Sequence, residues 1–285
     1  MSRNTTIILA LVLAVYALLS LYRPGGLMAY ALPSACWGLL TLATLKLGGF
    51  RKIKSWFNKQ VALMAVLAAI FQIIFLVDAG LITGFGKSPL SFTPQFLIIN
   101  SILVLSTLLG TELSRAYLTK NLGRKRPVLT LGLVTLLYTF INTSVIGLIT
   151  LFNPNNPLPL ADYLGSKFLP IVTENLLATY LAFLGGPMAS LAYRGPLQAF
   201  QWFCPILPNL TWGFEALIGV MTPTISLFIV NQAVNPKLLK KIGLLAETKE
   251  THRLNRAKKS SQTGWVAIAI LLVLTQTLEL ERIGY

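Results

Sequence analysis

Charged side chains are scarce in this sequence, and acidic ones most of all. Only 12% of the 285 residues are charged, and 9 Asp and Glu stand against 24 Lys and Arg. A soluble globular domain is about a quarter charged. The shortage of charge, together with 54% hydrophobic residues, excludes an ordinary soluble protein and predicts a chain embedded in a lipid bilayer.

Histidine and cysteine are also nearly missing. The chain has one histidine, His252, and two cysteines, Cys36 and Cys204, which lie far apart in the sequence. A zinc site needs several such ligands at short spacing, and a disulfide framework needs paired cysteines. We therefore expect no metal, no cofactor and no disulfide framework. Because His252 falls in a hydrophilic loop, a Ser-His-Asp site within the membrane is excluded as well.

What the sequence does contain is a series of apolar runs, each near the ~20 residues that cross ~30 Å of hydrocarbon. Each run must be helical, because a lone strand would leave backbone groups unpaired in lipid. The predicted fold is an all-α, polytopic transmembrane bundle of eight or nine helices. The expected spans are 6–22, 27–46, 61–83, 95–117, 128–151, 169–184, 187–206, 212–232 and 265–280. This divides the chain into a multi-helix domain (1–234), a basic loop (235–264) and a final span with its tail (265–285).

The basic residues gather in three loops between these runs, near 46–59, 115–126 and 237–259. The positive-inside rule makes such loops cytoplasmic. We expect a multi-pass protein of the plasma membrane with its N-terminus in the cytoplasm and its C-terminus outside. Topology then accounts for the net charge of +15, and nucleic acid is not expected as a partner.

The loop 152–167 is poor in basic residues and is expected outside, so an odd number of spans must separate it from the third basic loop. The sequence Gly185-Gly186-Pro187 is a place where a helix is expected to stop. Ending one span there and beginning another gives three crossings and places Arg194 inside the membrane. The alternative is an interfacial or re-entrant segment at 197–210.

Ionisable side chains at membrane depth cost about 2.5–3.5 kcal/mol each to insert, so they are candidates for function. Glu174, Asn175 and Arg194 are the candidates here, and a Glu174–Arg194 pair would relieve two desolvation costs together. Such a pair serves either as a structural clamp between helices or in transport or catalysis.

Three further ionisable residues, Asp78, Glu112 and Arg115, fall nearer the predicted ends of their spans. We interpret them as interfacial anchors, with Glu112 and Arg115 as an i,i+3 ion pair.

The third basic loop has an amphipathic pattern. Lys237, Lys240 and Lys241 fall on one side and apolar residues on the other. The pattern predicts a helix lying on the anionic inner leaflet.

The segment from Thr173 to Leu197 (TENLLATYLAFLGGPMASLAYRGPL), followed by Trp202-Phe203 and PILP at 205–208, resembles the multi-spanning membrane region of a subgroup of signal peptidase I-like proteins. In those proteins a basic loop precedes a last span that starts near a Trp, here Trp265. The resemblance implies that an external catalytic domain, either following Tyr285 or acting as a partner, cuts secreted preproteins. It supplies no catalytic residue within this sequence.

A weaker similarity is to the CPBP intramembrane proteases, whose motif has paired glutamates shortly before an Arg-Gly. Arg194 and Gly195 match this motif, but Ala189 and Ser190 stand where the glutamates belong. The similarity implies a degenerate relative without a general base.

These observations favour a non-catalytic membrane protein that positions substrate for signal-peptide processing. The alternatives are a small-solute transporter or channel using Glu174 and Arg194, and a degenerate intramembrane protease.

Overall fold

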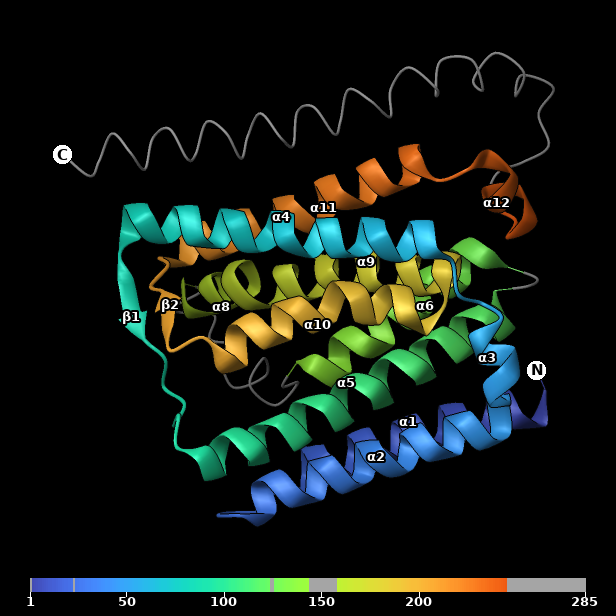
Figure 1. Ribbon diagram of the computed structural model, residues 1–285, viewed down its shortest axis with the longest axis horizontal. Coiled ribbons are helices and arrows are strands. Elements are labelled where there is room, and N and C mark those ends of the chain that lie inside the picture. Colours follow the sequence, from blue (N-terminus) through green and yellow to red (C-terminus); the bar gives the residue numbers. More distant parts are fainter. Residues whose placement is uncertain (1, 23, 124–125, 144–157, 245–285) are drawn as a thin grey trace.

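The computed structural model of the chain describes residues 2–22, 24–123, 126–143 and 158–244 (Figure 1). The helices preceding the first strand are α1 (Arg3–Leu21), α2 (Met28–Gly48), α3 (Phe50–Lys54) and α4 (Lys59–Thr83). Strand β1 (Phe85–Lys87) is followed by α5 (Pro94–Leu122), α6 (Pro127–Asn142), α8 (Leu158–Tyr163), the π-helical turn η1 (Leu164–Phe168), α9 (Leu169–Gly185) and α10 (Pro187–Phe203). Strand β2 (Ile206–Pro208), α11 (Trp212–Ala233) and α12 (Pro236–Lys241) complete the described part.

Among the residues that the structure describes, six helical stretches are long and apolar enough to cross a membrane. They are α1, α2, α4, α5, the continuous stretch Leu158–Gly185 and α11. Helices α6 and α10, with 16 and 17 residues, are shorter, and at 1.5 Å per residue α10 is roughly 25 Å long. The all-α membrane bundle is therefore confirmed, whereas eight or nine spans remain a prediction. The expected span 265–280 and the second part of 128–151 lie outside the described residues.

One expected loop is helical. Residues 158–167 were assigned to an outside connection, but α8 and η1 extend α9 toward the N-terminus without a break. Pro159 lies in the first turn, where its missing N–H costs no hydrogen bond. The turn η1 comes immediately before Pro170 and has a wider bond from the Leu169 N–H to the Leu164 carbonyl. The prolines and the polar composition of this segment predicted a loop. The prediction was wrong because a π-helical turn accommodates Pro170 within a continuous helix, and the sequence gives no sign of that turn.

The predicted break between two helices at Gly185-Gly186-Pro187 is confirmed. Gly186 has a φ of 73°, a left-handed conformation that other residues rarely adopt. A Cβ at Gly186 would lie 2.9 Å from the Cβ of Trp56, so only glycine fits against the loop that precedes α4. The turn between α9 and α10 therefore packs on the first basic loop.

The other end of α10 lies at the opposite end of the bundle. Strand β2 pairs antiparallel with β1, with Phe85 opposite Pro208 and Lys87 opposite Ile206. Figure 1 shows the two strands at one end, and α3 and α12 at the other. We call these the strand end and the basic end. Helix α10 runs between them, but it is not among the described helices that are long and apolar enough to cross a membrane. A crossing here and an interfacial or re-entrant segment at 197–210 therefore both remain predictions.

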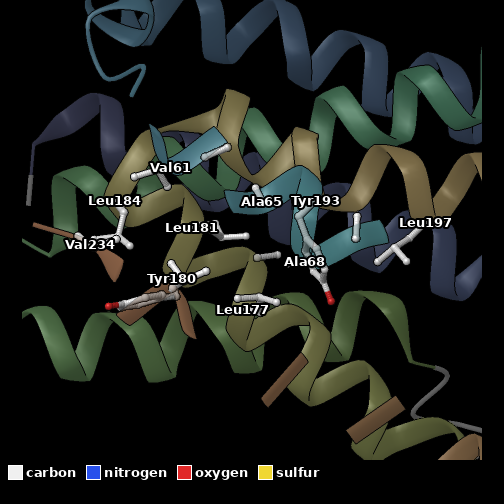
Figure 2. Close-up of a cluster of buried hydrophobic side chains, with 14 of the residues drawn as sticks. Val61, Ala65, Ala68, Leu177, Tyr180, Leu181, Leu184, Tyr193, Leu197 and Val234 are labelled. Carbon is white, nitrogen blue, oxygen red and sulfur yellow. The ribbon is translucent and has the colours of Figure 1, made fainter. Parts of the chain in front are cut away.

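The core is built around α9. Helix α10 packs against α4, α5 and α9, while α11 packs against α4 and α9, and α2 packs against α5. In Figure 2 Leu177 and Leu181 of α9 lie among Ala65 and Ala68 of α4 and Tyr193 of α10. The alanines let the helices approach closely, which is how helices associate in lipid.

The described part of the third basic loop differs from the expectation. Leu239 of α12 is buried, and Leu238 and Ile242 pack against the same core cluster as α9. The apolar side of this short helix contacts the protein, and the placement of its lysines on a lipid leaflet remains a prediction. Lys237 is exposed.

The structure predicts which loops share a side of the membrane. In a variant without Cys36 and Cys204, Asn209→Cys and Lys87→Cys should react with a membrane-impermeant maleimide from the same side of intact cells, because β1 and β2 are paired. Ser55→Cys, at the basic end, should react only after permeabilisation. Equal labelling of Asn209→Cys and Ser55→Cys in intact cells would contradict this topology.

A candidate site in the polar network between the helices

The predicted pair of Glu174 and Arg194 is present. An Arg194 guanidinium nitrogen lies 3.4 Å from Glu174 Oε2, and the two side chains are 11% and 20% exposed, respectively. The other Glu174 oxygen accepts a hydrogen bond of 2.7 Å from the side-chain amide of Gln72 on α4. The Tyr193 hydroxyl in turn donates to Gln72 Oε1 at 2.7 Å. This branch of the network therefore joins α9, α10 and α4.

A second branch surrounds Arg115 on α5, which is completely buried. Its Nε lies 3.0 Å from Glu112 Oε2, so the predicted i,i+3 ion pair is present. One terminal nitrogen donates to the backbone carbonyl of Asn175 at 3.2 Å and to the Thr179 hydroxyl at 3.0 Å. The other donates to Asn175 Oδ1 at 2.8 Å. The second branch therefore joins α5 to α9.

Helix α6 closes the second branch. The Arg115 guanidinium lies over the ring of Tyr138, 4.3 Å from its centroid, a favourable cation–π arrangement. The Tyr138 hydroxyl shares a 2.6 Å hydrogen bond with Ser114. The Asn142 amide donates to Asn175 Oδ1 at 3.4 Å. The two terminal nitrogens of this buried guanidinium are hydrogen-bonded to α9, whereas its Nε and the Glu112 carboxylate make an ion pair without a hydrogen bond.

The location of Glu112 and Arg115 corrects the sequence interpretation. They were interpreted as interfacial anchors, but their side chains are 1% and 0% exposed. Helix α5 continues to Leu122 and is covered by α1, α2, α6, α9 and α10. The expected span 95–117 ended too early, so the pair was assigned to the end of a helix rather than to its covered middle turns. Asp78, for comparison, is half-buried in the last turns of α4.

Adjacent residues of α9 connect the two branches. Successive residues of an α-helix point about 100° apart, so Glu174 faces α4 and α10 while Asn175 faces α5 and α6. Asn175 is completely buried, and its own amide donates to the Ile171 carbonyl at 2.9 Å. The network contains two arginines and two glutamates and is therefore balanced in formal charge.

Sequence reasoning missed Gln72, Tyr193, Tyr138 and Thr179 as members of the network. A usable signal existed for Gln72, since it is the only strongly polar residue between positions 61 and 77. Thr179 carried no such signal, because threonine side chains in helices often bond only to their own backbone, and nothing in the sequence around Tyr138 distinguishes it from other tyrosines.

The network binds helices together through contacts within the protein. Both of its carboxylates are paired with arginines, and Ser190 donates to the Pro187 carbonyl. Ala189 and Ser190, which stand where a CPBP protease has glutamates, are completely buried. Among the described residues no group of three His, Cys, Asp or Glu is arranged to hold a metal ion, and Cys36 and Cys204 are both free. Comparison with models of protein families, with curated proteins and with solved structures gives no match for this chain.

The Arg115 branch should dominate stability. Arg115→Met is expected to lower the free energy of unfolding by about 3–5 kcal/mol, because it leaves the Glu112 carboxylate buried without a counter-charge. Combining it with Glu112→Gln removes both charges and should regain much of the loss. Denaturant titration of the purified protein in mixed micelles measures both.

The matched control is the exposed pair of Lys167 and Glu215, whose side chains are 56% and 31% exposed at a separation of 2.9 Å. Lys167→Met should change stability by less than about 1 kcal/mol, since solvated ion pairs contribute little. A double variant as unstable as Arg115→Met alone would show that the ion pair is not the source of the loss.

Proposed function

We propose that the chain is a non-catalytic membrane domain that positions preproteins for signal-peptide processing. The observation that carries this proposal is that each deep charge has a counter-charge beside it, and that Arg115 and Glu174 are also hydrogen-bonded to neighbouring helices. A transport or catalytic site needs a group free to take up a substrate or a proton, whereas a positioning domain needs a rigid framework. Two branches that fix α4, α5, α6, α9 and α10 supply such a framework.

The strand end is the part of the bundle best suited to bind a preprotein. Phe85, Ile206 and Trp212 lie there and are 44%, 56% and 60% exposed. Tryptophan beside apolar residues is typical of the membrane–water interface. The charge pattern of the loops predicts that this end faces outside, which is where signal peptides are cut. The resemblance of residues 173–208 to signal peptidase I-like membrane regions supports the same function, with a signal peptidase catalytic domain doing the cutting.

Site-specific cross-linking tests this proposal in the full chain. A photoreactive phenylalanine analogue placed at Phe85 should cross-link to a radiolabelled preprotein whose cleavage is blocked by a mutated cleavage site. The same analogue at Phe57, which is 50% exposed at the basic end, is the matched control and should give little product. Both replacements keep an aromatic ring at an exposed position, so folding should be unaffected.

Equal yields at Phe85 and Phe57, or no product at Phe85, would refute positioning at the strand end. A cross-link at Phe85 that is lost when the signal peptide's apolar segment is replaced by polar sequence would support it.

Solute transport is a second candidate, favoured by one observation. Unlike Arg115, Arg194 and its partner Glu174 are partly exposed, so a small solute or ion can contact these two side chains from the surface of the protein. If they carry ions, proteoliposomes under a potassium-driven membrane potential should show proton flux above that of protein-free vesicles, followed with an enclosed pH-sensitive dye. Glu174→Gln should abolish that flux and Lys167→Met should retain it. The positioning function instead predicts no flux above the protein-free vesicles for any variant.

A further inference from the structure

A groove of about 390 Å³ lies at the basic end between α6 and the last turn of α5. Its lining residues are Leu122, Arg126, Leu129, Thr130, Leu133 and Val134. Val134 and Thr130 are 2% and 6% exposed, whereas Leu129 and Leu133 are 51% and 59% exposed. The groove thus has a closed floor and an open apolar side. No part of the network between the helices opens into it.

The charge pattern of the loops predicts that the basic end lies at the membrane surface, so the groove is expected to begin there and continue inward. Arg126 is exposed and precedes the first residue of α6, and Leu133 follows seven positions later. At 1.5 Å per residue this is roughly 10 Å along the helix, well short of the ~30 Å hydrocarbon thickness. Pro127 contacts the segment after α12, since a Cβ at Gly243 would lie 3.4 Å from it. The mouth of the groove is therefore at the basic end.

Charge and size favour a lipid as the occupant. Arg126 is the third of three consecutive cations in the sequence, after Arg124 and Lys125, and basic residues at the cytoplasmic surface attract anionic lipid headgroups. An acyl chain is narrow enough to lie along Leu129 and Leu133.

We propose that this groove binds one anionic phospholipid, with the phosphate at Arg126 and an acyl chain along Leu122, Leu129 and Leu133. The site is separate from the strand end, so it does not depend on the positioning function. A bound lipid fastens the two helices that carry Arg115 and Tyr138 at the end where their connection, residues 123–126, is short.

Native mass spectrometry of the full chain tests the site. The protein, released from detergent, is titrated with phosphatidylglycerol or with phosphatidylcholine of the same acyl chains. Phosphatidylglycerol should bind more tightly, and Arg126→Gln should weaken it about five-fold, as expected for one cation near an anionic headgroup. Phosphatidylcholine binding should be unchanged by that substitution. Lys237→Gln, an exposed lysine at the same end, is the matched control and should leave both lipids unaffected.

A second variant tests the acyl part without altering charge. Leu133→Trp places a bulky ring in the open side of the groove and should weaken binding of phosphatidylglycerol, while its largely exposed position makes it compatible with folding. Circular dichroism verifies the helix content of each variant. Equal affinity for the two lipids, or wild-type binding by both Arg126→Gln and Leu133→Trp, would overturn the proposal.

Discussion

A completely buried guanidinium imposes the strictest constraint on this structure. Arg115 is completely buried, so its charge must be neutralised by the protein itself, and its terminal N–H groups need acceptors there. Glu112 supplies the charge from the same helix, and Asn175 and Thr179 of α9 supply the acceptors. The ring of Tyr138 covers its face. Because the guanidinium is planar and rigid, these partners fix how α5, α6 and α9 are rotated relative to one another.

The rotation of α9 then determines where the other charges go. With Asn175 directed at Arg115, the preceding residue Glu174 points to the other side of α9, toward Gln72 and Arg194. Five helices are held in this way by side chains of one helical turn. The rest of α9 presents leucines and alanines to its neighbours, whose packing is not directional. The polar turn thus specifies the arrangement that the apolar contacts stabilise.

The two ends of the bundle differ in the way that a membrane protein requires. At the basic end the turn at Gly186 contacts Trp56, and Arg126 lines the groove between α5 and α6. At the strand end, exposed aromatic and apolar residues lie around β1 and β2. A phospholipid at one end and an extended polypeptide at the other would meet the same rigid set of helices, so contacts at either end act on a framework that is already fixed.

The sequence by itself determined the class of structure, because a bilayer leaves a continuous apolar chain no alternative to helices. It also determined the helix break at Gly185-Gly186-Pro187, which follows from backbone chemistry, and the ion pair of Glu112 and Arg115, which follows from their spacing on one helix. The Glu174–Arg194 pair could also be predicted, because pairing two opposite charges in neighbouring apolar runs lowers the desolvation cost of both.

Only the tertiary structure decided that Arg115 is buried and which groups surround it. Its partners on α9 are 60 or more positions away, and the bond between Tyr193 and Gln72 spans 121 positions. Helical periodicity fixes which residues share a face of one helix, but not which helix that face will meet. These contacts between helices depend on the packing of several helices at once. For that reason they are not encoded in any single segment of the sequence.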